Sequence, residues 1–241
     1  MVSEPEWLRQ QAQLFAEELT RTVQAVVPDS DPFTVVITDN LVSVRQGPRE
    51  GVTLTVNGKP LLHLKATFRC CKDRDGDYLA IEKSGFEVLP LAGREPIFRY
   101  EYVRNHGKAP AAHAHVHAHR DAFTYLMAKA GRTTPRARRR ASADEIPQIQ
   151  DLHFPLGGHR FRPCLEDVLQ TLIEEFGVDY KAGTMDALAS GREAWRKKQA
   201  RSVVRDDPAS AVEVLQKLGY DVVWNSEQPE PTVRRDRLRQ H

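Results

Sequence analysis

Apolar residues recur every three or four positions near the start of the chain, which is the spacing of one face of an α-helix. The stripe ends before Pro28, whose ring does not fit a helix interior. Its members are Leu8, Ala12, Phe15, Leu19, Val23 and Val26. We predict an N-terminal helix whose apolar face packs on the protein core.

From residue 33 onward the period of apolar positions falls to two, and β-branched residues become frequent, which is typical of half-buried strands. The segments are 33–38, 41–45, 51–56, 61–69, 77–82, 86–91, 97–103 and 113–119. Turn-forming residues such as Asn57-Gly58 separate them, and no helical pattern intervenes. Successive strands should therefore pair antiparallel. The pattern predicts one curved antiparallel sheet of about six to eight strands.

A second stripe with helical spacing follows later in the chain. It consists of Leu165, Val168, Leu169, Leu172, Ile173 and Phe176. Pro163 lies near its start and Gly177 lies where a C-terminal cap belongs, which predicts a central helix that covers one face of the sheet. Further on we expect a charged helix through Trp195 and a shorter helix that begins at Asp207-Pro208 and ends at Gly219.

These elements predict an α+β fold. We expect residues 1–178 to form a core domain that includes a basic loop at 120–150. Residues 179–225 should form a helical extension, and residues 226–241 a disordered charged tail.

The composition is that of a folded globular protein, because 40% of the 241 residues are hydrophobic and 28% are charged. No stretch reaches the roughly 18 apolar residues of a membrane span, and the N-terminal residues lack the pattern of a signal peptide. We therefore expect a cytoplasmic protein with no membrane partner. Cys70, Cys71 and Cys164 form no C-x-x-C pair, which favours reduced thiols over a zinc knuckle.

Positive charge is concentrated in one segment, although the whole chain carries only +2. Between residues 106 and 140, eight basic residues accompany one acidic residue, Asp121. The basic residues are Lys108, Arg120, Lys129, Arg132, Arg136, Arg138, Arg139 and Arg140. From Arg120 onward these residues are candidates for nucleic-acid binding, since clustered cations attract polyanions. A solvated loop with a basic run is an equally good interpretation.

Four histidines alternate with small apolar residues in the segment HAHVHAH, at positions 113, 115, 117 and 119. In a strand, side chains two positions apart share a face, so His113, His115, His117 and His119 would line one side. Imidazole titrates near neutrality and binds metals, whereas a merely polar strand face needs neither property. We therefore predict a functional role for these histidines.

Two kinds of chemistry fit this pattern. Alternate strand residues can converge on one metal ion, although four of them span roughly 20 Å, so a metal site needs a ligand from elsewhere. The candidates are His153, His159, Glu82 and Glu101, and none of them has a diagnostic spacing. Alternatively, two imidazoles cleave a phosphodiester without metal, one as general base and one as general acid, while an arginine offsets the developing charge.

The segment IFRYEY upstream alternates as well. In a strand, Arg99 and Glu101 share one face, where Arg99 can contact phosphate and Glu101 can orient a histidine. Tyr100 takes the other face and is a candidate for stacking on a base. A surface ion pair with a tyrosine in an ordinary core is the competing interpretation.

IFRYEY, the histidine segment and DLHFPL ahead of the helix PCLEDVLQTLI together resemble the TumE family, toxins of bacterial toxin-antitoxin pairs. Arg99, Tyr100, Glu101, His115 and His117 fall on the family's scheme, as do residues 165–169, and the resemblance covers at most residues 33–177. The N-terminal helix, residues 120–150 and the region after residue 180 lie outside the family pattern. The resemblance implies growth inhibition through RNA and neutralisation by a cognate antitoxin protein.

The leading hypothesis is a metal-free ribonuclease without a cofactor, with His115 and His117 as the catalytic pair. His113 and His119 would assist them, and Arg99 with Arg120 would offset charge. The first alternative is a hydrolase or oxygenase that holds a divalent transition metal with His115, His117 and a carboxylate. The second is an interaction protein without enzymatic activity that docks an acidic partner.

Overall fold

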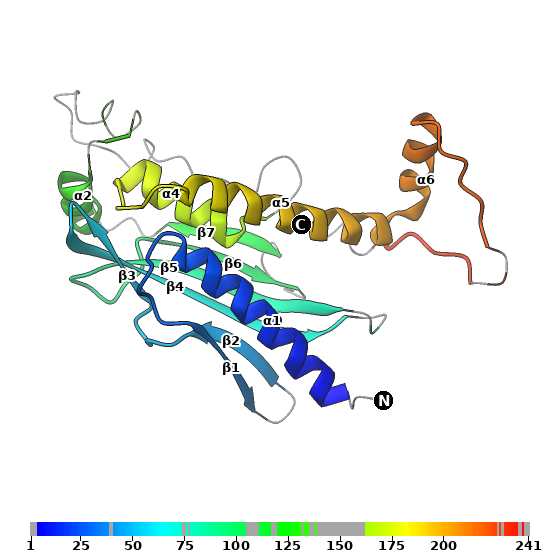
Figure 1. Ribbon diagram of the computed structural model, residues 1–241, viewed down its shortest axis with the longest axis horizontal. Coiled ribbons are helices and arrows are strands. Elements are labelled where there is room, and N and C mark those ends of the chain that lie inside the picture. Colours follow the sequence, from blue (N-terminus) through cyan, green and yellow to red (C-terminus); the bar gives the residue numbers. More distant parts are fainter. Residues whose placement is uncertain are drawn as a thin grey trace.

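Seven strands form one antiparallel sheet in the described part of the chain, and the helices α1, α4 and α5 lie on the same side of it (Figure 1). The computed structural model describes residues 4–38, 41–73, 76, 78–104, 111–116, 120–131, 133–134, 138, 162–225, 227, 229–235 and 238. The elements are α1 (Glu4–Gln24), β1 (Phe33–Thr38), β2 (Leu41–Gln46), β3 (Val52–Val56), β4 (Lys59–Lys72), β5 (Leu79–Pro90), β6 (Phe98–Val103), β7 (Ala112–Val116), α2 (Arg120–Lys129), α4 (Leu165–Phe176), α5 (Thr184–Asp206) and α6 (Pro208–Lys217). The predicted α+β class and antiparallel sheet are confirmed.

The strand order is β1-β2-β4-β5-β6-β7, and β3 pairs with β4. The 14-residue strand β4 has room for two partners on one side. Residues 67–70 of β4 pair with β2, whereas residues 59–64 pair with β3. The other side of β4 pairs with β5 along its length, and β6 and β7 follow.

The period of two divides the sheet into a covered face and an open face. On β4, Leu62, Leu64 and Ala66 are fully buried and belong to the core that includes α1 and α4. The alternate residues Lys65 and Thr67 are only half-buried. We call the sheet face that carries Lys65, Thr67 and their neighbours on adjacent strands the open face.

The predicted N-terminal and central helices are confirmed, and their apolar stripes form the core. On α4, Val168, Leu169, Leu172 and Phe176 have no exposed surface. Gly177 ends α4 with a φ of 69° and donates its N–H to the carbonyl of Ile173. A Cβ at Gly177 would lie 2.6 Å from the Cα of Gly131, so both the backbone conformation and the space require glycine there.

The predicted basic loop at 120–150 is wrong for residues 120–129, which form helix α2. Phe123, Leu126 and Met127 have helical spacing and are buried in the core. This short apolar stripe stabilises a helix despite the positive charges around it, since burial of such side chains outweighs local polarity. Most of residues 130–150 lie outside the described residues.

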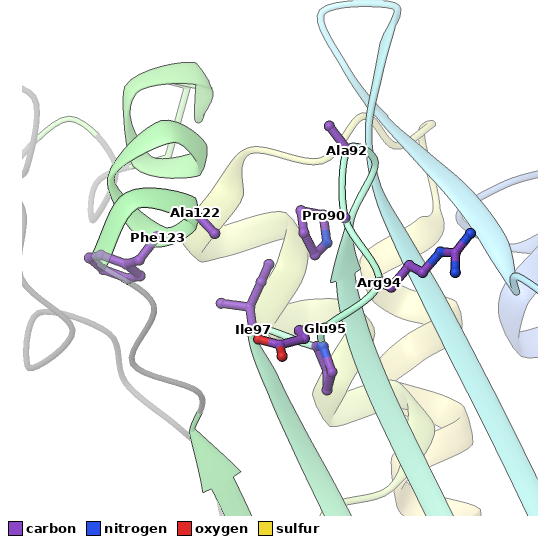
Figure 2. A pocket seen from close by; sticks show the side chains of 9 residues that line it. Pro90, Ala92, Arg94, Glu95, Ile97, Ala122 and Phe123 are labelled. Atoms are coloured by element: carbon purple, nitrogen blue, oxygen red, sulfur yellow. The ribbon is translucent and has the colours of Figure 1, made fainter.

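A cavity of about 230 Å³ lies between α2 and the turn that connects β5 to β6 (Figure 2). Pro90, Ile97, Ala122 and Phe123 give it an apolar lining, and Glu95 also borders it. None of the candidate catalytic residues borders it, so this cavity is separate from the sites considered below.

The two predicted C-terminal helices are present, and the second begins at Pro208 as predicted but ends at Lys217, two residues before Gly219. Leu188 on α5 is buried in the core, and Thr184 donates a hydrogen bond to the carbonyl of Ala25 at 2.6 Å. Asp207 accepts the backbone N–H of Ser210 and so caps α6. No residue of α6 is buried, and this helix projects away from the sheet in Figure 1. None of the helices in the described part of the chain combines the length and the apolarity that crossing a membrane requires.

The contribution of the core is tested by Leu172→Ala. Leu172 has no exposed surface, so its truncation removes apolar contacts and leaves a cavity. We expect a loss of about 2–5 kcal/mol in the free energy of unfolding, measured by urea denaturation. The matched control is Leu14→Ala on α1, where 51% of the side chain is exposed. A change in the control as large as that in Leu172→Ala would contradict this assignment of the core.

A pH-dependent contact fixes the turn between β3 and β4. Asp179 accepts hydrogen bonds from the Thr55 hydroxyl at 2.7 Å and from the backbone N–H groups of Asn57 at 2.9 Å and Gly58 at 2.8 Å. Partial burial opposes ionisation of Asp179, but the three hydrogen bonds outweigh it and lower the pKa of this carboxyl.

Asp179→Asn should therefore destabilise the protein by about 1 kcal/mol at neutral pH, because the charged acceptor is lost. A lowered pKa in the folded state gives stability that is present above the unfolded-state pKa and disappears as the pH falls through the folded-state pKa. The difference between parent and variant in urea denaturation should thus vanish in strong acid. Asp221→Asn, at an exposed position, is the control and should show no difference at either pH.

Candidate functional site

Strand β6 carries its polar and apolar residues on opposite faces of the sheet. Phe98 and Tyr100 are buried in the core, whereas Arg99 and Glu101 lie on the open face. This division is the one that the alternating sequence predicts. It delivers a cation and a carboxylate, two positions apart, to the same surface.

The pairing of β6 with β7 brings two histidines to this surface. His113 lies directly opposite Glu101 across the strands, and His115 lies opposite Arg99. On its other side Glu101 faces Gly85 of β5, which has no side chain. The space around the Glu101 carboxylate is therefore shared mainly by Arg99, His113 and His115.

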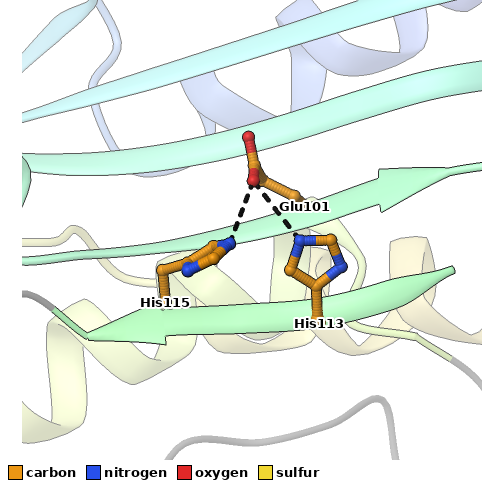
Figure 3. A group of neighbouring side chains, drawn as sticks. All are labelled: Glu101, His113 and His115. Atoms are coloured by element: carbon orange, nitrogen blue, oxygen red, sulfur yellow. Dashed lines mark ion pairs between the residues drawn. The ribbon is translucent and has the colours of Figure 1, made fainter. Parts of the chain in front are cut away.

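One carboxylate oxygen is the centre of this cluster (Figure 3). Oε2 of Glu101 lies 3.4 Å from Nε2 of His113 and 3.3 Å from Nε2 of His115. Nε of Arg99 lies 3.5 Å from the same oxygen. The two imidazole rings are edge to face, with their centroids 4.8 Å apart.

The cluster is accessible from solvent on one side. The His115 side chain is 44% exposed, whereas those of Glu101 and His113 are 22% and 13% exposed. A ligand can therefore reach His115 directly, while the neighbouring strands hold Glu101 and His113 in place.

The spacing of the three side chains is compatible with a metal site. One ligand atom from each of Glu101, His113 and His115 lies within 4.8 Å of the other two. Ligands about 2.0–2.1 Å from a tetrahedrally coordinated zinc ion lie about 3.4 Å from each other, which matches the two distances from Glu101 to the imidazoles. Two imidazoles and one carboxylate are also the donor set of several catalytic zinc and iron centres.

The sequence predicted His115 and His117 as the reacting pair, and the structure places His115 together with His113 beside Glu101. His117 and His119 lie outside the described residues. Position along one strand identifies which histidines share a face, but only the register with β6 identifies which of them meet Glu101.

Tyr100 is not brought to the site. Its side chain faces the core and is 4% exposed, so base stacking by this ring finds no support in its position. Burial, with a smaller contribution from Asp167, raises the pKa of its hydroxyl. The hydroxyl is buried and has no hydrogen-bond partner in the described part of the chain.

Few of the predicted nucleic-acid-binding residues have described side chains. Lys129 and Arg138 are exposed. The backbone of Arg120 begins α2, but its side chain lies outside the description, as do Arg132, Arg136, Arg139 and Arg140. The structure therefore leaves their predicted role in nucleic-acid binding as a prediction.

Comparisons with models of protein families, with curated proteins and with solved structures gave no match to this chain. The resemblance to the TumE family stays a prediction from the sequence alone.

Proposed function

We propose that this chain is a hydrolase that holds a divalent transition metal between Glu101, His113 and His115. The observation that carries this proposal is the convergence of three ligand atoms within 4.8 Å on two adjacent strands. A metal in this position would supply Lewis acidity and lower the pKa of a bound water. The site lies on an open surface, which favours hydrolysis over oxygen activation, because the latter benefits from exclusion of water.

Anionic esters are the proposed substrates. A divalent cation with two neutral imidazoles and one carboxylate leaves a net charge of about +1, and Arg99 adds another. A phosphodiester is attracted to such a centre, and the guanidinium of Arg99 is suited to bind its non-bridging oxygens. RNA remains the proposed polymer, as the basic segment and the resemblance to RNA-acting toxins suggest.

A metal-free ribonuclease of the toxin type is the second candidate. The contacts of Glu101 with both imidazoles favour it, since a carboxylate can orient one histidine as general base and stabilise the protonated form of the other. Arg99 would then offset charge on the phosphorane. In this second candidate, His113 and His115 would be the catalytic pair, in place of the His115 and His117 that the sequence analysis proposed. The expected partner is a cognate antitoxin.

Metal binding separates the two candidates. After treatment with a chelator and dialysis, the parent should bind Zn²⁺ or Mn²⁺ with one-to-one stoichiometry in calorimetry. Glu101→Gln and His113→Ala should each lose at least about tenfold in affinity, because each removes a ligand. His63→Ala is the control, since His63 also lies on the open face but contacts Thr53 instead. Absence of stoichiometric binding by the folded parent would contradict the metal proposal.

Cleavage of labelled RNA tests the proposed reaction. The metal-loaded parent should cleave it, and His115→Ala should reduce the rate by about 100-fold or more. A chelator should abolish the activity, and added metal should restore it. Cleavage that survives the chelator but is lost in His115→Ala would establish the metal-free candidate instead. If the parent and His115→Ala gave equal rates, both candidates would be excluded.

A further inference from the structure

The guanidinium of Arg162 lies near two aromatic rings on the covered side of the sheet. Its Cζ atom is 4.0 Å from the centroid of the Tyr102 ring and 5.0 Å from that of Trp195. Tyr102 is on β6 and Trp195 on α5. Since Tyr102 alternates with Glu101 along β6, this cluster and the proposed metal site are on opposite faces of the same strand.

No carboxylate pairs with Arg162 among the described residues. Arg192 of α5 lies on the same side of the sheet and, unlike Arg162, pairs with a carboxylate. Nε of Arg192 lies 2.7 Å from a carboxylate oxygen of Asp167, and Gln170 accepts a further hydrogen bond. Among the described residues, a carboxylate therefore pairs with Arg192 but not with Arg162.

The electrostatic surroundings of Arg162 favour the binding of an anion. Burial lowers the pKa of its guanidinium, Tyr102 opposes this shift, and the positive charge of Arg104 adds a smaller lowering. A partly buried cation without a counter-charge is unfavourable, and a second cation nearby increases the cost. The indole N–H of Trp195 is a further donor in this cluster that is buried without an acceptor.

The position of Arg162 beside the two rings suits it to bind a tetrahedral oxyanion. The rings of Tyr102 and Trp195 both lie within 5.0 Å of Cζ, and the N–H groups of a guanidinium lie along its planar edge. Arg162 is half-buried, so part of its side chain is in contact with solvent. The parallel N–H donors on this edge can form bidentate hydrogen bonds to a tetrahedral oxyanion.

We propose that Arg162, held against Tyr102 and Trp195, is a binding site for a phosphate group, either free or within a phosphodiester. The proposal is independent of the metal site, because none of its residues contributes to that cluster. It predicts that phosphate stabilises the folded protein and that the Trp195 ring reports its binding.

Thermal unfolding with inorganic phosphate tests this site. Phosphate at millimolar concentration should raise the Tm of the parent by about 3 °C relative to sodium chloride of equal ionic strength. Arg162→Gln should abolish this rise, whereas Arg201→Gln, at an exposed position on α5, should retain it. Glu101→Gln should also retain it, which separates this site from the proposed metal centre. An equal rise in Arg162→Gln, or none in the parent, would overturn the proposal.

Fluorescence provides a second readout that does not depend on the folding of Arg162→Gln. Of the three tryptophans, Trp7 and Trp224 can be replaced by phenylalanine, which leaves Trp195 as the only indole. Titration with inorganic phosphate should change its emission saturably, and sodium chloride should not. A short single-stranded RNA that acts at lower concentration than phosphate would identify the phosphodiester as the source. If neither probe changes the emission, the inference is wrong.

Discussion

The register between β6 and β7 is the constraint on which the candidate site depends. It sets His113 opposite Glu101 and His115 opposite Arg99. A shift by one residue would turn both imidazoles toward the covered face and leave Ala114 beside the carboxylate, because side chains alternate with a period of two. Burial of Phe98 and Tyr100 in the core fixes which face of β6 carries Arg99 and Glu101. Hydrophobic burial on one face of β6 thus determines which of its residues reach the candidate site on the other face.

Much of the architecture follows from periodicity in the sequence. The stripes of α1 and α4 and the alternation of β1 to β6 are long enough to determine both the element type and the buried face. Helix α2 escaped prediction because only Phe123, Leu126 and Met127 mark its apolar side, within a segment dominated by charge and turn-forming residues. Local composition is a poor guide where a few side chains are buried by tertiary contacts.

The candidate site was predictable in its residue types but not in its pairing. Alternation alone placed Arg99 with Glu101 and His113 with His115. The sequence gives no direct information on the register between two strands, and this register brings His113 opposite Glu101. His117 lies outside the described residues, so its predicted role stays a prediction. Arg162 could not be found from the sequence at all, since its aromatic neighbours Tyr102 and Trp195 are 60 and 33 positions away.

The close contact of Gly131 with Gly177 has a consequence for how this chain can diverge. Gly131 also donates its N–H to the carbonyl of Phe176, so the point where the chain leaves α2 is attached to the end of α4. The return point, Cys164, is buried at the start of the same helix. Gly131 and Cys164 are both buried. A side chain at Gly131 or Gly177 would push the end of α4 away from the end of α2, so related chains can vary at exposed positions of these helices more readily than at these two glycines.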